Sequence, residues 1–592
     1  MKIMFKNIAY LSRYIYKFAP SAFLLILFNS IFHTLTITLN ILGTKYVLDA
    51  LTQGMSWVYI VQVLSVYAVC YLIFNLYFTF SDYYTSKIYT LITNKMDMEL
   101  MNKASSIDYS CFDNPDFFDK HTRAMTAASA SASNLISTYT AILSNLTAIV
   151  TISGILISIG LQYILLAAFN VIVSYYVILK KNKRQFKYDQ DITRINRQVG
   201  YFKGLIFKPS VVKDIRADNA ADYFINKHQN VFSEWYGKFI KHKKAMARPD
   251  YFENSTGAAT FFLTMLFAAK DVFAGTLSAG AYISTMNAVQ ALSQQLSSLV
   301  FQFPNLIQQS RYIENLRFLL ELPCDVECAL PSHIILKPKE NYKIEFVDVT
   351  FSYPNSAKKV LDHVSFTLHA GSRTAIVGEN GAGKTTITKL LLRLYDPQEG
   401  SILIDGVDVK DINITSLRNC ISMVFQDVNI FSTTVRENIA FGLEKQNDEL
   451  FHYLKELKLY NKIIDAREGI DTPVSRDFYE DGIVFSGGEQ QKVAIVRALC
   501  KKSGFVIMDE PSSALDPNSE HELLELIRST LHHKTVLIIS HRLSMCLTVD
   551  NILYLSEGRI VEQGSHEELM ALSGHYSRLF NMQASSYRKE AE

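Results

Sequence analysis

The sequence has little that would suit nucleic acid or a disulfide framework. Its 59 lysines and arginines nearly balance 57 aspartates and glutamates, so the formal net charge of +2 gives no argument for nucleic acid as a partner. The seven cysteines are scattered. The close pair Cys324 and Cys328 has no second pair or nearby histidine to complete a zinc site. We therefore expect free thiols in a reducing compartment.

The N-terminus lacks the organisation of a secretory signal peptide. Basic and apolar residues interleave in MKIMFKNIAYLSRYIYKF, and no cleavage site follows a short apolar core. The pattern predicts an amphipathic helix on the inner membrane face, with basic side chains suited to anionic headgroups. These side chains are Lys2, Lys6, Arg13 and Lys17.

Long apolar runs, in contrast, fill residues 1–322, which we expect to form an all-α membrane domain. A bilayer core takes about 20 apolar residues per helix. Six segments satisfy this condition, near 19–42, 57–80, 138–159, 162–179, 251–273 and 279–303. Only a short stretch around Gly160 separates the third from the fourth, which predicts a tight hairpin.

Charge asymmetry predicts how these spans are oriented. Basic residues crowd the N-terminus and the runs 180–184 and 238–248, whereas the segments that would lie outside are short and carry few charges. Because lysine and arginine favour the cytoplasmic side, both termini should be cytoplasmic.

Two connections, 81–137 and 180–250, are too long for simple loops. Both are polar, with apolar residues at helical spacing, and each has a turn signal near its middle: Asp113-Asn114-Pro115 and Pro209-Ser210. We interpret them as helices that continue into the cytoplasm and return. Two small inserted domains are the alternative, but neither segment has strand patterning.

Polar residues in the spans are costly in lipid and should face the bundle interior. They fall on one face of the first span (Asn29, His33, Thr36 and Asn40) and on one face of the last (Asn287, Gln290, Gln294 and Ser297). Both faces could line a wet cavity or form hydrogen bonds between helices. Basic residues are nearly absent from the spans, which disfavours a strongly anionic head group held at mid-membrane.

The chain changes character after residues 323–342, a proline-containing linker with no clear period. From there, residues 343–592 alternate strand and helix signals, as in an α/β domain with a largely parallel sheet. The complete chain should be a multidomain membrane protein, with its six-helix domain followed by this α/β domain.

A phosphate-binding loop stands in TAIVGENGAGKTT, residues 374–386, between an apolar strand and a helix. Glycines let backbone N–H groups turn toward a phosphate, and the helix N-terminus adds partial positive charge. Lys384 would reach the β- and γ-phosphates, and the Thr385 hydroxyl would ligate Mg²⁺. The expected nucleotide contacts are Gly378, Glu379, Asn380, Gly381, Ala382, Gly383, Lys384, Thr385 and Thr386.

Two later apolar runs end in residues suited to the same chemistry. The run 505–508 ends in Asp509, a candidate Mg²⁺ ligand, and Glu510, a candidate base for the attacking water. The run 535–540 delivers His541, which beside the other two motifs we assign to the γ-phosphate.

FSGGEQQ, residues 485–491, opens another helix with an N-terminus suited to an anion. Ser486 is a good N-cap, and Gly487 and Gly488 allow close backbone approach. Because the chain already has a phosphate loop, this segment, including Glu489, should complete the nucleotide site of another copy.

Together these residues resemble the ATP-binding cassette (ABC) family over essentially the whole chain. Its motifs occur in order: Tyr353 in FSYP, the phosphate loop, Gln426 in VFQD, FSGGE, Asp509-Glu510, the turn 513–516 with Asp516, and His541. The resemblance implies that Tyr353 stacks on adenine, that Gln426 senses Mg²⁺ and the attacking water, and that Asp516 belongs to the nucleotide site. It also implies two cassettes that enclose two ATP molecules head to tail.

Six spans followed by one cassette is similar to the exporter branch with long intracellular helices. That resemblance implies that the tips of the projections, 109–124 and Lys208–Arg216, rest on the cassettes. ATP binding would turn the membrane half outward, and hydrolysis would reset it.

Some features depart from the family pattern. Phe485 and Glu489 replace the commonest Leu and Gln, and the segment 475–482 is longer than usual and resembles a bacterial subgroup. The N-terminus has no room for the cysteine peptidase of peptide-processing exporters, so leader cleavage is not expected.

These patterns predict an ATPase-coupled exporter of an amphipathic small molecule, peptide or lipid in a bacterial cytoplasmic membrane. An inward transporter of the same fold and a non-transporting membrane ATPase or sensor stay open. For the second half-transporter we favour a homodimer, with the competent half of a heterodimer as the alternative. The transported substrate is not specified.

Overall fold

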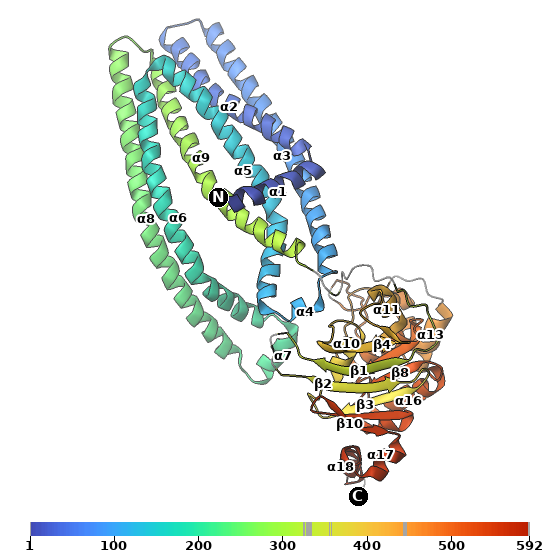
Figure 1. Cartoon of the computed structure of the whole chain (residues 1–592). Coiled ribbons are helices and arrows are strands. Elements are labelled where there is room, and N and C mark those ends of the chain that lie inside the picture. Colours follow the sequence, from blue (N-terminus) through green and yellow to red (C-terminus); the bar gives the residue numbers. More distant parts are fainter. Residues whose placement is uncertain are drawn as a thin grey trace. The chain divides into compact units, whose positions relative to one another are not determined.

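A computed structural model of the chain describes residues 2–323, 326, 334–354, 356, 358–441, 447–476 and 478–589. The chain divides into two compact units (Figure 1). The helical unit comprises Met1–Ala104 and Asp119–Glu321, and the sheet unit comprises Ser105–Phe118 and Leu322–Glu592. Much of the predicted linker 323–342, with Cys324 and Cys328, lies outside the described residues. The five described cysteines are free thiols, as predicted for them.

Long helices make up the helical unit. They are α1 (Lys2–Phe18), α2 (Ser21–Thr52), α3 (Trp57–Ala104), α5 (Pro115–Ile159), α6 (Leu161–Leu205), α7 (Pro209–Ala217), α8 (Ala221–Phe273) and α9 (Ala279–Leu320), where the start of α5 belongs to the sheet unit. Only Gly160 separates α5 from α6, as the tight-hairpin prediction required.

Each predicted span lies inside one of these helices. Over the described residues, five helices are long and apolar enough to cross a membrane, within α2, α3, α5, α6 and α8. The helix α9, which contains the predicted span 279–303, is not among them. Its sequence holds too many polar side chains, and these are largely buried: Ser284, Thr285, Ser293 and Gln295 are each at most 8% exposed.

The helix α9 is the inner element of the bundle and packs against α1, α2, α6 and α8. Its start comes very close to α2, because a Cβ on Gly280 would lie 2.3 Å from the Lys45 carbonyl oxygen. The Asp49 carboxylate accepts a hydrogen bond from the Gly280 N–H at 2.9 Å. A side chain at position 280 would therefore separate the two helices.

The amphipathic helix predicted at the N-terminus is α1, which docks on α9. Asn7 is 1% exposed and donates through Nδ2 to the Ser310 carbonyl oxygen at 3.0 Å. Arg317 donates to Asn7 Oδ1 at 2.9 Å. The buried face of α1 thus carries a polar anchor among its apolar residues.

Both long connections are helical, so the alternative of two inserted domains is wrong. The first turn is formed by α4 (Tyr109–Phe112) and the start of α5 at Pro115, and the second by α7, which begins at Pro209. Proline suits the first turn of a helix because its missing N–H needs no partner there. The residues 81–137 and 180–250 are all described and contain no strand.

The predicted polar faces of the first and last spans divide between the two alternatives. Asn29, His33 and Gln294 line one cavity, and Gln290, Gln294 and Ser297 line another. Other residues of these two faces form hydrogen bonds between helices or within one helix. Asn40 Oδ1 accepts from the Tyr67 hydroxyl at 2.8 Å, Asn287 lies 3.5 Å from Thr44 Oγ1, and Thr36 bonds the Phe32 carbonyl oxygen.

The sheet unit contains the expected, largely parallel sheet and an antiparallel sheet that sequence patterning did not predict. Over the described residues, the first has the order β10-β9-β3-β8-β7-β6, parallel except for β10, and the second has the order β2-β1-β4-β5. The strands are β1 (Ile344–Phe351), β2 (Leu361–Leu368), β3 (Arg373–Gly378), β4 (Glu399–Ile404), β5 (Val407–Asp408), β6 (Ile421–Val424), β7 (Phe505–Asp509), β8 (Thr535–Ile539), β9 (Asn551–Ser556) and β10 (Arg559–Gly564).

Helices cover the parallel sheet, whose central strands β7 and β8 are buried throughout. Such continuous apolar runs are typical of strands covered on both faces. The helices are α10 (Lys384–Leu391), α11 (Ile414–Cys420), α12 (Val435–Ala440), α13 (Asn447–Glu456), α14 (Tyr460–Ile464), α15 (Gly487–Cys500), α16 (Pro517–Thr530), α17 (His566–Leu572) and α18 (His575–Lys589), with short 3₁₀ turns at Gly469–Asp471 and Leu543–Thr548. Since β3, β8, β7 and β6 are parallel neighbours, the residues that follow them meet at one edge of the sheet.

Candidate active site

The phosphate loop connects β3 to α10. Two of its glycines are needed because other main-chain segments lie too close for a side chain. A Cβ on Gly378 would lie 2.0 Å from the Leu555 carbonyl oxygen, and one on Gly383 would lie 2.9 Å from that of Val360. Gly383 also has a φ of 107°, a conformation that favours glycine. Because α10 begins directly after Gly383, the loop carries N–H groups suited to an anion.

Lys384 is held at the base of this loop. Its side chain is largely buried, and Nζ donates to the carbonyl oxygens of Gly378 at 2.8 Å and Glu379 at 2.9 Å. Burial lowers the pKa of Lys384, while the carboxylates of Glu510 and Asp509 act in the opposite direction. The ammonium group is thus fixed within the loop that the sequence assigns to phosphate.

Asp509 ends β7 as a buried carboxylate with unused hydrogen-bonding capacity. It is 2% exposed, and its Oδ1 has no hydrogen-bond partner among the described residues. Burial raises the pKa of Asp509 to about 6, although a hydrogen bond from Thr385 opposes that shift. A buried carboxylate oxygen beside a hydroxyl on a phosphate loop is a donor set that fits Mg²⁺.

Glu510 follows directly and joins three predicted site residues into one cluster. Its Oε2 accepts a hydrogen bond from Gln426 Nε2 at 2.9 Å and lies 3.2 Å from His541 Nδ1. The strands β6, β7 and β8 deliver these residues to the same edge, as their parallel order requires. The Glu510 backbone has a φ of 50°, in the left-handed region that side chains rarely adopt.

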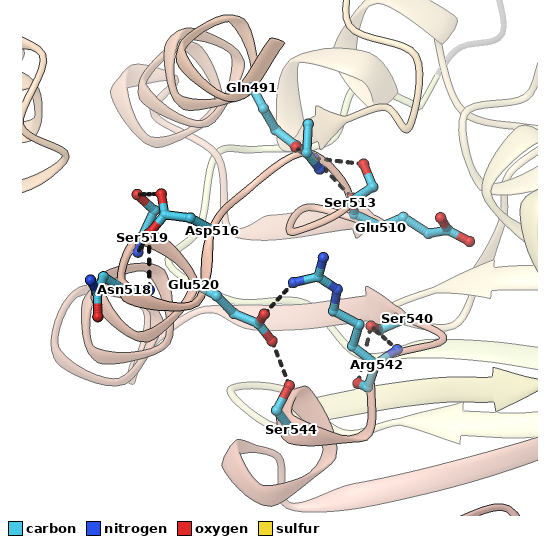
Figure 2. A network of polar contacts seen from close by, with 11 residues as sticks. Gln491, Glu510, Ser513, Asp516, Asn518, Ser519, Glu520, Ser540, Arg542 and Ser544 are labelled. Atoms are coloured by element: carbon cyan, nitrogen blue, oxygen red, sulfur yellow. Dashed lines mark hydrogen bonds and ion pairs between the residues drawn. The ribbon is translucent and has the colours of Figure 1, made fainter. Parts of the chain in front are cut away.

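Gln491, which sequence reasoning missed, supports this strained turn (Figure 2). Its Nε2 donates to the Glu510 carbonyl oxygen at 2.9 Å and to Ser513 Oγ at 3.2 Å, and its Oε1 accepts from the Ala514 N–H at 2.9 Å. Gln491 lies on α15, one turn beyond the FSGGE segment. Its position in FSGGEQQ was visible, but nothing in the sequence shows which loop its amide reaches.

A second polar contact, which the sequence did not predict, joins α16 to Arg542, the residue after His541 (Figure 2). The Glu520 carboxylate accepts from the Arg542 guanidinium and from Ser544 Oγ, the latter at 2.5 Å. Ser540 Oγ accepts from the Arg542 N–H at 2.9 Å. The segment after His541 is thus held from α16, and Ser540 links it to the end of β8.

We expect Glu520→Gln to misplace His541 and to lower the kcat for ATP by as much as about 10²-fold with little change in KM, because small displacements at a reacting centre are costly. Steady-state ATPase kinetics at several ATP concentrations would measure this split. Glu525→Gln is the matched control, since Glu525 lies on the same helix in an exposed pair with Arg528 at 3.1 Å. A rise in KM alone, or equal loss in both variants, would contradict a positioning role for Glu520.

The FSGGE segment forms the N-terminus of α15, as predicted. Ser486 and Glu489 make a reciprocal capping box, and Lys462 pairs with Glu489 at 2.6 Å. Burial would raise the pKa of Glu489, but hydrogen bonds from Lys462 and Ser486 leave it lowered. No described hydrogen bond or ion pair joins 486–489 to the loop 378–386.

Two predicted nucleotide contacts have other partners in this structure. The Tyr353 hydroxyl lies 3.0 Å from Thr386 Oγ1, and its ring packs edge-on against Tyr395 at 5.5 Å. The Asp516 carboxylate caps α16 by accepting from the Asn518 and Ser519 N–H groups and from Ser519 Oγ (Figure 2). Their assignment to the nucleotide stays a prediction. Of the unusual segment 475–482, Asp477 lies outside the described residues.

These units define a class of protein: a multi-pass membrane protein whose sheet unit is a P-loop ATPase domain. The sequence model of the family described as "ABC transporter" matches residues 361–513. The matched residues lie in the sheet unit, which is a C-terminal nucleotide-binding domain. Such a domain binds and hydrolyses ATP, generally with Mg²⁺, and ABC exporters function as dimers.

Curated relatives cover different shares of the chain. It is 29% identical over 510 residues to the subtilin transport ATP-binding protein SpaT of Bacillus subtilis, covering 84% of this chain and 81% of that protein. It is 37% identical over 309 residues to the ATP-dependent lipid A-core flippase of Legionella pneumophila strain Paris, covering 52% of this chain. The second match spans about half the length of the relative, 51%.

A solved structure matches nearly the whole fold. It is described as a bacterial Atm1-family ABC exporter with ATP bound, and it aligns with a TM-score of 0.76 at 24% identity. The alignment covers 97% of this chain and 99% of that chain. At this identity the likeness shows the fold, which is that of an ABC exporter.

Proposed function

We propose that the chain is a half-transporter that exports a solute from the cytoplasm by ATP hydrolysis. The observation that carries the proposal is the complete set of reacting groups at one sheet edge, where Glu510 lies between Gln426 and His541 and close to Asp509. A regulatory protein that does not hydrolyse ATP would not need this set. Both termini are then cytoplasmic, and the membrane is the bacterial cytoplasmic membrane.

Each residue of the site has a separate role. Lys384 and the N–H groups of the loop bind phosphate oxygens, and Thr385 and Asp509 hold Mg²⁺. The bound Mg²⁺ supplies positive charge against the phosphates. Glu510 accepts the proton of the attacking water, while Gln426 and His541 hold its carboxylate in place. His541 also contacts the γ-phosphate, and Tyr353 stacks on adenine.

A second copy completes each site. Ser486, Gly487 and Gly488 present a helix N-terminus that has no described polar contact with the chain's own phosphate loop, and an anion is the natural partner of such an end. Every reacting group is present in this chain, which allows the second copy to be of the same chain; we favour this homodimer, and a heterodimer is the alternative outcome of the test below. The membrane domain comprises residues 1–322 and the ATPase domain 343–592.

The test is the ATPase activity of the protein purified alone in lipid nanodiscs. Robust turnover supports a homodimer, whereas a folded but inactive protein would contradict it and direct the search to a partner half. Inverted membrane vesicles measure direction: ATP-dependent uptake into them means export, and loss of preloaded solute from them means an inward transporter.

Within the sheet unit, the segment Ser105–Phe118 is connected to the phosphate loop through tyrosines. The Tyr395 hydroxyl donates to the Asp113 carboxylate, and the Tyr395 ring lies edge-on to Tyr109 at 5.7 Å. Tyr395 also contacts Tyr353, whose hydroxyl lies beside Thr386. Burial, followed by the bond to Asp113, raises the pKa of Tyr395, so its hydroxyl stays a donor. This contact can transmit the state of the loop to α3 and α5.

We expect Tyr395→Phe to uncouple the segment from the nucleotide. In wild type, ATP with Mg²⁺ should slow amide hydrogen exchange in both the phosphate loop and residues 105–118. The variant should keep the first effect and lose the second, because the hydrogen bond to Asp113 is gone. Tyr109→Phe is the control, since it keeps the ring and removes a hydroxyl with no described partner. Unchanged protection of 105–118 in Tyr395→Phe would refute this coupling.

A further inference from the structure

The helical unit contains a cavity of about 470 Å³ that is lined by α2, α3, α5 and α9. One part of its wall is apolar, with Leu25 and Ile26 from α2, Ile88 from α3 and Ile136 from α5. The remaining wall is polar. A cavity with both kinds of surface suits a solute with an apolar body and a polar end.

Some polar groups at this cavity already have partners. Asn29 Oδ1 accepts from the Tyr77 hydroxyl at 2.8 Å and from Ser81 Oγ at 2.6 Å. Asn145 donates to Ser298 Oγ at 3.0 Å. These bonds fix the wall and leave little capacity for a solute at those positions.

Asp82 and the His33 Nδ1 atom are among the lining groups that have no described partner. The Asp82 carboxylate lines the cavity, is exposed, and has no ion-pair or hydrogen-bond partner among the described residues. His33 Nδ1 is buried and also lacks a partner among them. In a neutral histidine with its proton on Nε2, Nδ1 is an acceptor. The charged group that the wall offers to a solute is therefore the Asp82 carboxylate.

The formal charge of the cavity wall is negative among the described lining residues. No lysine or arginine is among the described lining residues, so Asp82 carries its formal charge. A neighbouring cavity of about 540 Å³, between α6, α8 and α9, differs in this respect. Its acid, Glu253, lies 3.7 Å from the Lys181 ammonium, which also pairs with Asp250 at 2.5 Å. The charge of Glu253 is thus already compensated, whereas that of Asp82 is not.

We propose that the cavity at Asp82 and His33 binds the solute to be exported, and that this solute is a cationic amphiphile with an N–H-bearing ammonium group. The ammonium group pairs with Asp82, and its apolar body lies on Leu25, Ile26 and Ile88. An anionic head group would face an uncompensated carboxylate there. The proposal rests on the proposed export function, whose substrate class it names.

Binding can be tested without ATP. Monodansylcadaverine is a fluorescent amphiphile with a primary ammonium group, and its N-acetyl derivative is a neutral match of the same shape. We expect wild-type protein in nanodiscs to bind the amine at least tenfold more tightly than the acetylated form, after subtraction of binding to empty nanodiscs. Asp82→Asn should remove that preference.

Glu253→Gln is the matched control and should leave the preference unchanged. Equal binding of the two probes to wild type, or a preference that survives Asp82→Asn, overturns the proposal. An elution volume in size-exclusion chromatography and a melting temperature equal to those of wild type would show that Asp82→Asn is folded. The exporter proposal fails by a separate result. In that result, inverted wild-type vesicles bind the amine but do not accumulate it when ATP is added, and so do not differ from Glu510→Gln vesicles.

Discussion

Replacing Glu510 with glutamine should lower the steady-state ATPase rate by about 10²–10⁴-fold, the range that a general base contributes. The side chain keeps its shape and its position between Gln426 and His541, but an amide cannot take a proton from water. Nucleotide binding should persist, because the phosphate loop and Asp509 are untouched. Phosphate release and ATP binding, measured on the same preparation, separate the two effects.

The control is Asp411→Asn, which neutralises an exposed acid of the same sheet unit away from the site. It should retain wild-type turnover. Residual activity of Glu510→Gln within a few-fold of wild type would mean that another group takes the proton, and His541→Ala in the same background would identify it if that group is His541.

Replacing Asp509 with asparagine should abolish Mg²⁺-dependent hydrolysis and, in the ligand-free protein, stabilise the fold. The folded-state pKa of about 6 lies above the ordinary aspartate value of 3.8, so the folded protein holds this proton more tightly than the unfolded chain does. Stability is therefore lost as the pH rises from about 3.8 to about 6, and above pH 6 the full penalty applies. At about 1.4 kcal/mol per pKa unit, the neutral amide should recover about 1–3 kcal/mol at pH 7.5.

Thermal unfolding followed by circular dichroism, without nucleotide, would measure this gain. The difference between wild type and Asp509→Asn should shrink as the pH falls from 7.5 to 5, because the wild-type carboxylate then becomes neutral. For the same reason the Mg²⁺ affinity of wild type should fall as the pH drops through about 6. A variant less stable than wild type at pH 7.5 would contradict burial as the cause of the raised pKa.

Sequence reasoning was most reliable where chemistry is local in the chain. The phosphate loop, the two acids after β7 and the cap of α15 each need only a short run of residues, and all three have the expected local structure. The helical nature of 81–137 and 180–250 also followed from periodicity alone. In these segments the local sequence is sufficient to determine the conformation.

Sequence reasoning missed contacts that depend on tertiary packing. The amide of Gln491 supports Glu510 from a helix 19 residues earlier. The pairing of Glu520 with Arg542 spans 22 residues and looks from the sequence like two ordinary surface charges. The antiparallel sheet of β1, β2, β4 and β5 was also missed, because its strands have short, mixed patterns separated by the phosphate loop and α10.

The buried polar surface of α9 has a consequence for assembly in the membrane. A helix that is not apolar enough to enter the bilayer by itself must meet its partners before it is stable there. Since α9 packs against α1, α2, α6 and α8, which precede it in the chain, those helices can already be in place when it is synthesised. The close approach at Gly280 and the bond from its N–H to Asp49 then act as a docking point. We therefore expect α9 to be stable in the membrane only after these helices are in place.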